Sequence, residues 1–549
     1  MEEKRVILKL SDLEHTYVAQ TSHGELLVGE GGYRPMELVL VALAGCSGVD
    51  VSHILKKKRQ EVKDIQIEVI GLRRDEHPRV YERISIRYKV YGKDLKEKAG
   101  YLLSNLLSQG GEYGEIFYER VRACRIQLED NKIDKVQWGI DEGVGIRLIK
   151  DGKTYYGYTT EPTFENLMEI VRTLARGQGH GPVKVGQRRI RGWTDLKIDP
   201  DEKGIDYRAE FLLRANETAR SYGDKVKQVM VVLTDRTRDI LIINSLGEMA
   251  EDLQKRVVFF TDVVASQDGI MQRGYESVGI KGGFEVFERV KPEDVARKAT
   301  ERALLMLKAK PAPAGNFTVV LAGQAGGTMI HEAVGHGFEA DLVQKGLSVY
   351  RGKIGQKVAS ELITVLDDAT LENHLGSFTV DDEGVPAQRT VLIEKGYLVG
   401  YMYDRLTAMR EGKESTGNGR RQSYAHVPIV RMTNTFIAPG KDNTEDIIGD
   451  TKKGVLVLKM GGGEVNTVTG DFVFEIIEGY MIENGKITYP IRSATLIGNG
   501  PKALMDVDAV GSDLGWSIGT CGKDGQGVPV SDAQPTLRIR SMVLGGTEV

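Results

Sequence analysis

The sequence of 549 residues predicts an α+β protein, because runs of alternating apolar and polar residues occur beside amphipathic helical segments. Apolar residues make up 41% of the chain and charged residues 28%, so the chain can bury a large core and form several domains. Breaks rich in Gly, Pro or charge occur near residues 92–98 and 310–315. We therefore predict domains at residues 1–97, 98–310 and 311–549.

The first part is predicted to be a small α+β module. Its predicted strands are residues 6–8, 25–28, 65–72 and 81–90. Pro35 favours the start of a helix, which ends in four cations at residues 56–59. The most apolar stretch, residues 38–49, is shorter than the roughly 20 residues that span a bilayer. We expect a buried helix here and no membrane segment.

The second part is predicted to combine helices with long strands. Its predicted helices are residues 99–108, 163–175, 207–222 and 292–308. Its predicted strands are residues 115–128, a hairpin through 139–157, and residues 229–233, 240–243, 256–264 and 270–277. Short turns separate the last four strands, so we expect them to form an antiparallel meander.

The third part is predicted to be mainly β-structure. A strand at residues 318–321 leads into one short helix, and many short β-type runs follow as far as residue 540. A barrel or a layered sheet is the expected architecture of this part.

Charge and cysteine content exclude several classes of protein. Lys and Arg number 74 and Asp and Glu 78, a net charge of −4, which gives no global attraction to nucleic acid or an anionic membrane. The three cysteines argue against a disulfide framework and for a reducing compartment. No secretory signal is visible at the N-terminus, so we expect a cytoplasmic protein without nucleic-acid or membrane partners.

The strongest chemical motif is H-E-x-x-x-H, formed by His331, Glu332 and His336. Two imidazoles can bind a metal, and a carboxylate between them can act as a base towards water. The histidines are five residues apart, so a regular α-helix would point them about 140° away from each other. We therefore predict a widened or broken helix at residues 334–337.

A catalytic zinc usually has three protein ligands, so the chain must supply a third. Cys521 lies in a glycine-rich segment, and we expect Lys523 to favour its thiolate. The candidates for the third ligand are Glu339, Asp341, His374, His426 and Cys521. The residues alone leave this choice open.

Four segments together resemble the TldD/PmbA family of metallopeptidases, on its TldD side. They are residues 327–337, 416–428, 431–435 and 519–526, and the resemblance extends from about residue 98 to the C-terminus. It implies that His331, His336 and Cys521 bind one zinc ion per active subunit and that Glu332 is the base. It also implies an α+β domain followed by a β-rich catalytic domain.

The resemblance carries expectations about partners and substrate. It implies a homodimer or a heterodimer with a PmbA-like subunit, and a narrow access that admits unfolded peptide. PmbA-side members lack the histidine motif, so this chain looks like the active type. The loop from residue 418 to 426 is either a surface turn or a contact for an extended peptide. Its candidate substrate-binding residues are Asn418, Arg420, Arg421, Tyr424 and His426.

The first module resembles part of the OsmC-like proteins, on the segment from Gly32 to Cys46. In that family a cysteine on this helix reduces peroxides with a second cysteine, which implies a redox role for Cys46. The pattern should continue into a second helix with a resolving cysteine, but the TldD-like segment begins there instead. We therefore expect a truncated module used for packing, dimer contact or substrate admission.

The sequence thus predicts a zinc-dependent peptidase acting on unfolded or extended peptides, with iron as the alternative metal. One alternative is a thiol peroxidase or redox protein centred on Cys46. Another is a peptide-binding scaffold with a structural metal and no catalysis.

Overall fold

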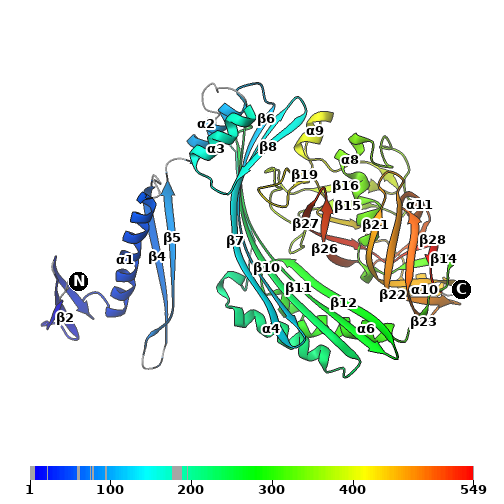
Figure 1. Ribbon diagram of the computed structural model, residues 1–549, viewed down its shortest axis with the longest axis horizontal. Coiled ribbons are helices and arrows are strands. Elements are labelled where there is room, and N and C mark those ends of the chain that lie inside the picture. Colours follow the sequence, from blue (N-terminus) through cyan, green and yellow to red (C-terminus); the bar gives the residue numbers. More distant parts are fainter. Residues whose placement is uncertain are drawn as a thin grey trace. The chain divides into compact units, whose positions relative to one another are not determined.

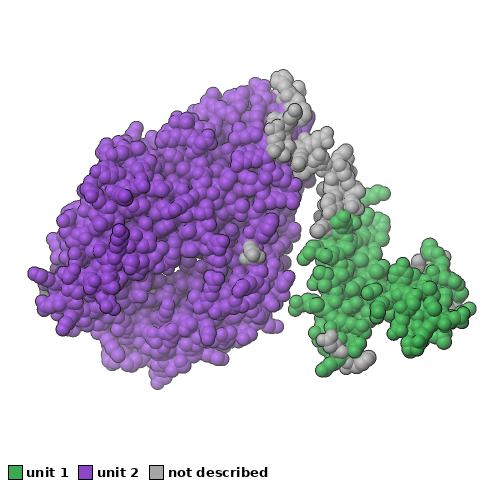
Figure 2. All heavy atoms as spheres, turned by 180° about the vertical axis from the view of Figure 1, so that it is seen from behind, with its two compact units in different colours: residues 1–98 green, residues 99–549 purple. Residues whose placement is uncertain are grey.

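The computed structural model describes residues 6–21, 23–57, 62–74, 76, 79–92, 95–175, 188–194 and 196–547. The chain divides into two compact units, residues 1–98 and residues 99–549, coloured separately in Figure 2. The second unit contains both the predicted second and third domains.

The first unit is a small α+β module. Its elements are β1 (Ile7–Leu10), β2 (Thr16–Thr21), β3 (Gly24–Gly29), α1 (Pro35–Lys57), β4 (Val62–Arg73) and β5 (Tyr81–Gly92). Strands β1, β2 and β3 form one antiparallel sheet, and β4 pairs with β5 as a hairpin that contacts α1.

The prediction that α1 is buried is wrong for the described part of the chain. None of its residues is buried, although the helix has 23 residues and an 18-residue window of mean hydropathy 1.9. By length and composition alone this helix could cross a membrane. Within the first unit the helix contacts the β4–β5 hairpin through β4, and this contact buries none of its residues.

The second unit begins with a seven-stranded sheet of order β12-β11-β10-β6-β7-β8, with β9 pairing in parallel with β11. Its strands are β6 (Tyr113–Glu129), β7 (Lys132–Lys150), β8 (Lys153–Thr159), β9 (Arg188–Trp193), β10 (Val226–Asn244), β11 (Glu248–Gln267) and β12 (Ile270–Lys281). The predicted antiparallel meander is confirmed as β10, β11 and β12.

Helices cover this sheet where its side chains are apolar. They are α2 (Leu95–Leu106), α3 (Phe164–Ala175), α4 (Ile205–Arg220), α5 (Val286–Arg289) and α6 (Pro292–Met306), so the four predicted helices are confirmed within a few residues. Figure 1 shows α4 and α6 against the long strands, where they bury a common core with β10 and β11.

One strand prediction is wrong in an informative way. Residues 229–233 and 240–243 belong to a single strand, β10, of 19 residues. The polar residues between the two apolar runs are not a turn, because their side chains form buried ion pairs. The Asp235 carboxylate pairs with Arg208, and Arg238 pairs with Glu119.

The last part of the chain contains a closed barrel, which confirms the predicted β-rich architecture. Its five strands are β14 (Gly315–Leu321), β21 (Lys453–Val465), β22 (Asp471–Glu483), β24 (Ala494–Asn499) and β28 (Leu537–Gly545). The barrel closes because β22 pairs with both β21 and β24. Three strands extend it: β13 (Lys310–Pro311), β23 (Lys486–Arg492) and β25 (Val507–Val510).

A six-stranded sheet of order β17-β16-β15-β20-β27-β26 lies beside the barrel (Figure 1). Its strands are β15 (Val365–Asp368), β16 (Arg389–Glu394), β17 (Tyr397–Leu398), β20 (Asn434–Ile437), β26 (Gly515–Lys523) and β27 (Gln526–Gln534). The remaining elements are α7 (Thr328–Ala333), α8 (Ala340–Lys345), α9 (Arg405–Glu411), β18 (Gly419–Arg420), β19 (Ile429–Val430), α10 (Thr444–Gly449) and α11 (Gly500–Met505). Helix α7 contacts strands of both the barrel and this sheet.

Candidate metal centre

The two motif histidines lie on either side of a break in the helix, as the five-residue spacing predicts. Helix α7 ends at Ala333, Val334 has φ −131° and ψ −50°, and a 3₁₀ turn then covers Gly335–Phe338. The break needs glycine at position 335, where a Cβ atom would overlap the buried Met432 side chain. His331 and His336 are consequently able to face the same space.

Cys521 reaches the two histidines from the hairpin of β26 and β27. One ligand atom from each of His331, His336 and Cys521 lies within 4.8 Å of the others, and all three side chains are buried. The Cys521 Sγ lies 3.6 Å from His336 Nε2, and the two imidazole planes are at 89° to each other. Within the described residues this is the one cluster of three metal-ligating side chains.

The donor set fits zinc. Zn–S and Zn–N bonds of about 2.3 and 2.1 Å at a tetrahedral angle place sulfur and nitrogen about 3.6 Å apart. Two imidazoles and a thiolate are also softer ligands than magnesium or calcium prefer. The three residues could therefore hold one zinc ion and leave one position open.

Each histidine has a carboxylate behind it. His336 Nδ1 lies 2.9 Å from Glu339 Oε2, and His331 Nδ1 lies 3.4 Å from Asp532 Oδ1. Such carboxylates fix the ring orientation and leave the other nitrogen for a metal. Lys523 Nζ donates to Glu339 Oε2 at 3.0 Å, so one buried chain of contacts joins the histidine turn to the cysteine hairpin.

The electrostatics favour a thiolate among protonated imidazoles when no metal is bound. Burial alone would raise the pKa of the Cys521 thiol, but His331 and His336 beside it lower that pKa to about 5. Burial opposes the charge on His336, yet Glu339 and Cys521 raise its pKa to about 9. The pKa of His331 is likewise raised, by Cys521 and Asp532 against the effect of burial.

The expected role of Lys523 is corrected by this geometry. The imidazoles, not the ammonium group, favour the Cys521 thiolate. The Lys523 ammonium instead lies between the carboxylates of Glu339 and Asp341, at 3.0 and 2.7 Å.

Glu332 lies next to the ligand cluster and faces a cavity. Its side chain is 32% exposed, and its Oε2 lies 3.9 Å from His336 Nε2. The cavity has a volume of about 440 Å³ and is lined by β12 of the long sheet, by the barrel strands β21 and β22, and by β26. A carboxylate here can reach both the ligand cluster and a molecule in the cavity.

The other candidates for the third ligand lie elsewhere or behind the ligands. Glu339 contacts the outer nitrogen of His336, and Asp341 contacts Lys523. His374 lies against the Trp516 ring, with centroids 4.2 Å apart. The remaining candidate, His426, has its Nδ1 2.9 Å from the Ser423 hydroxyl.

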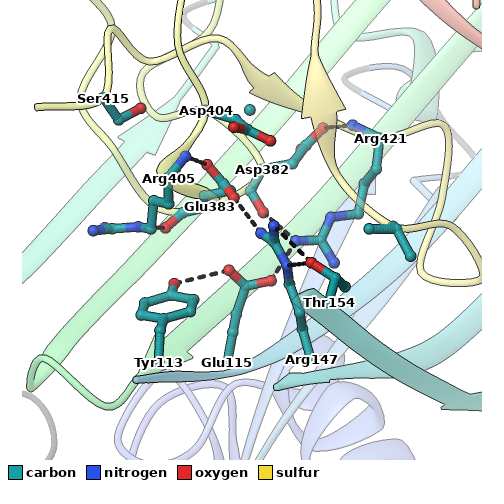
Figure 3. Close-up of polar contacts among 12 residues, drawn as sticks. Tyr113, Glu115, Arg147, Thr154, Asp382, Glu383, Asp404, Arg405, Ser415 and Arg421 are labelled. Carbon is teal, nitrogen blue, oxygen red and sulfur yellow. Dashed lines mark hydrogen bonds and ion pairs between the residues drawn. The ribbon is translucent and has the colours of Figure 1, made fainter. Parts of the chain in front are cut away.

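The side chains of the predicted substrate loop are used inside the protein. The Arg421 guanidinium is buried and pairs with Glu115, as Figure 3 shows. The Tyr424 hydroxyl donates to Asp141 at 2.8 Å. The remaining contacts are Asn418 Nδ2 to Asp367 Oδ2 at 2.8 Å, Arg420 Nη2 to the Pro529 carbonyl at 2.7 Å, and Ser423 with His426. Contact between this loop and a substrate remains a prediction.

Cys46 lies exposed on α1 in the first unit. The other two cysteines, Cys124 and Cys521, belong to the second unit and are buried. Within its own unit Cys46 therefore has no partner for a disulfide, because residues 1–98 contain no other cysteine.

Sequence analysis missed Asp532 and the orienting role of Glu339. Glu339 follows His336 by three residues, a spacing that lets side chains of one turn meet. No sequence pattern predicts the contact of Asp532 with His331. The two residues are far apart in the sequence, and the pairing of β27 with neighbouring strands brings Asp532 to the histidine.

Comparisons with known proteins give a consistent result along the chain. Three models of the PmbA/TldA metallopeptidases match: domain 1 at residues 114–176, the central domain at 198–307 and the C-terminal domain at 314–546. These models divide the predicted domain 98–310 in two. A model of OsmC-like proteins matches residues 28–107, which extends through α2, whereas the compact units divide at residue 98.

Curated relatives carry the name metalloprotease. A metalloprotease TldD homolog of Haemophilus influenzae is 37% identical over 456 residues, covering 79% of this chain and 93% of that protein. A metalloprotease of Methanothermobacter thermautotrophicus is 36% identical over 439 residues, covering 79% and 96%. A zinc metalloprotease TldD homolog of Saccharolobus solfataricus is 28% identical over 453 residues, covering 80% and 97%.

Solved structures share the fold. The crystal structure of TldE from Thermococcus kodakarensis superposes with a TM-score of 0.61 at 21% identity, covering 79% of this chain and 97% of that chain. A Thermotoga maritima protein superposes with a TM-score of 0.67 at 23% identity, covering 79% and 96%.

Proposed function

The chain belongs to the PmbA/TldD family of metallopeptidases, and from this premise we propose that it is a zinc-dependent peptidase of unfolded or extended peptides. The observation that carries the proposal is the convergence of His331, His336 and Cys521 beside Glu332 at a cavity. Zinc is supported by the donor set and by the name of one relative, a zinc metalloprotease.

Each residue has a defined task in this proposal. The three ligands would hold the ion, and the hydrogen bond to Glu339 would keep the His336 ring in orientation. The Asp532 carboxylate lies 3.4 Å from His331 Nδ1, close enough to stabilise a charge on that ring. A bound zinc ion lowers the pKa of a coordinated water and polarises a peptide carbonyl. Glu332 would accept the proton of the attacking water and pass it to the leaving amine, and its position 3.9 Å from His336 Nε2 supports this role.

The cavity argues for an extended substrate. The ligand side chains are buried, and they are reached from a space of about 440 Å³ between β12 and the barrel. A folded domain cannot insert its backbone into a space of this size, whereas a few residues of an unfolded chain can. The size of the cavity is therefore the reason for proposing unfolded or extended peptides as substrates.

The decisive test is Glu332→Gln in the full-length protein. We expect the variant to retain one zinc ion per chain by metal analysis and to lose about 10²-fold or more of its cleavage of an unfolded polypeptide. The control is Glu475→Gln, which changes another carboxylate lining the same cavity and should leave cleavage nearly unchanged. Unchanged cleavage by Glu332→Gln would remove this residue from its proposed role.

A companion measurement concerns the metal. Treatment with a chelator should abolish cleavage, and zinc should restore it. Cys521→Ala should lower zinc affinity in an equilibrium binding assay. A full zinc content at limiting free zinc in this variant would reassign the third ligand.

A further inference from the structure

A second cavity, separate from the metal centre, is surrounded by arginines. It has a volume of about 20 Å³ and lies where strands β10 and β11 of the long sheet meet the third part of the chain. Its five arginines are Arg236, Arg238, Arg256, Arg420 and Arg421. Guanidinium groups donate hydrogen bonds but accept none, so this lining is unusually rich in donors.

Two of these arginines are largely neutralised by carboxylates. Arg421 pairs with Glu115. Arg238 donates from Nε to Glu119 at 2.5 Å and from Nη1 to Asp382 at 2.6 Å. The third nitrogen, Arg238 Nη2, is buried and has no hydrogen-bond partner within the described residues. The whole Arg238 side chain is only 9% exposed.

Arg256 and Arg420 form no ion pair with a carboxylate within the described residues. Arg256 donates only to the carbonyl oxygens of Leu375 and Ser377 and to the side-chain amide of Gln254. Arg420 donates to the carbonyl oxygens of Met432 and Pro529. Their hydrogen bonds therefore go to neutral acceptors, although the carboxylates of Asp382 and Asp252 act on Arg420 and Arg256, respectively, from a greater distance.

Arg236 adds a third poorly compensated cation. Its guanidinium forms no hydrogen bond within the described residues and approaches Glu119 only to 3.9 Å. Burial and the guanidiniums of Arg420, Arg238 and Arg236 lower the pKa of Arg256 to about 9, against a smaller effect of Asp252. The cations around this cavity thus destabilise one another.

Two acids, Asp381 and Asp382, also line the cavity, and both already accept hydrogen bonds. Asp381 accepts three backbone N–H groups, from Glu383, Val385 and Gly419. Asp382 accepts from the Arg421 backbone as well as from Arg238. The unpaired donors of Arg236 and Arg238 therefore remain to be satisfied by something other than the protein.

We propose that this cavity is a binding site for one compact monoanion of the size of chloride. One water-sized sphere needs about 10–15 Å³, so about 20 Å³ fits a single small ion. An anion only accepts hydrogen bonds, which matches a lining of guanidinium donors. The unpaired donors that such an ion would accept from are Arg238 Nη2 and the Arg236 guanidinium.

The position of the site gives the anion a structural consequence. Arg420 also holds the carbonyl of Pro529 on β27, and Pro529 lies opposite Thr520 on β26, next to Cys521. A bound anion would fix the long sheet, the Arg420 segment and this hairpin to one another. The inference does not depend on peptidase activity, because it concerns binding and stability alone.

The first test measures thermal unfolding of the full-length protein in sodium chloride, bromide or gluconate at constant ionic strength. We expect chloride and bromide, but not gluconate, to raise the unfolding midpoint in a saturable manner. Arg236→Gln should weaken the apparent halide affinity about tenfold or more. This variant should fold, because Arg236 is 34% exposed and donates no hydrogen bond within the described residues.

The matched control is Arg214→Gln on α4, an arginine with 38% exposure that does not line the cavity. It should keep the halide response of the parent protein. Equal midpoints in halide and gluconate, or an unchanged halide response in Arg236→Gln, would overturn the proposal.

The second test locates the ion and its source. Crystals grown in bromide should show an anomalous peak between Arg236 and Arg256, and density for water alone would overturn the proposal. A peptide with a free C-terminal carboxylate should be compared with its amide. Neither peptide should remove the halide response, because a cavity of about 20 Å³ admits a small ion but not a carboxylate with its chain. Removal by the free acid alone would overturn the assignment to a compact ion.

Discussion

At the level of single residues, the proposed metal centre depends on groups other than its three candidate ligands. Glu339 holds the His336 ring, and Lys523 holds Glu339 while lying two residues from Cys521. The Lys523 ammonium also donates to the Val430 carbonyl at 3.0 Å. A single buried side chain therefore positions ligands that come from segments almost 200 residues apart in the sequence.

We predict that Lys523→Met lowers zinc affinity about 10- to 100-fold, because Glu339 and Asp341 lose their shared cation and His336 loses its fixed orientation. The measurement is an equilibrium zinc titration with a competing chelator. The control is Lys255→Met, which changes a lysine that is equally 7% exposed and also lies between two carboxylates, those of Asp199 and Asp201. Parent-like zinc affinity in a folded Lys523→Met protein would contradict the prediction.

At the level of elements, the break after α7 brings the two histidines together. Sequence spacing predicts this break, because a regular helix cannot aim residues 331 and 336 at one ion. The full extent of β10 could not be predicted in this way, since the partners of Asp235 and Arg238 come from distant segments. The exposure of α1 could not be predicted from the sequence either. An apolar run indicates burial, but it does not show whether other elements have enough surface to cover the helix.

We predict that Gly335→Ala destabilises the metal-free protein by about 1–3 kcal/mol, because a Cβ atom there displaces the buried Met432 side chain. The measurement is equilibrium unfolding in denaturant with a chelator present. Gly449→Ala on α10 is the control, since nothing lies within 4 Å of its Cβ position, and it should be neutral or slightly stabilising.

A double variant separates overlap from backbone strain. If the overlap with Met432 causes the cost, Gly335→Ala combined with Met432→Ala should be less destabilised than the sum of the two single changes. Strict additivity would place the cost in the backbone of the broken turn instead.

At the level of the whole second unit, buried ion pairs tie the long sheet to the third part of the chain. Arg147 on β7 pairs with Glu383, and Glu115 on β6 pairs with Arg421, as Figure 3 shows. The partners are 236 and 306 residues apart in the sequence. No local pattern could reveal these pairs, whereas the histidine motif was visible because its residues are neighbours in the chain.

Removing one charge of such a pair should lower the free energy of unfolding more than removing both charges. We predict that Arg147→Met destabilises the second unit by about 3–5 kcal/mol, because Glu383 is left as a buried charge without its partner. Adding Glu383→Gln should recover part of that loss, since the amide is neutral and still accepts from the Arg405 backbone. The exposed pair of Arg189 and Glu251 is the control, and Arg189→Met should cost less than about 1 kcal/mol. Denaturant unfolding with chelator is compared for five proteins: the parent, the double variant and the single variants Arg147→Met, Glu383→Gln and Arg189→Met. Additive losses in the double variant would show that the pair does not act through charge.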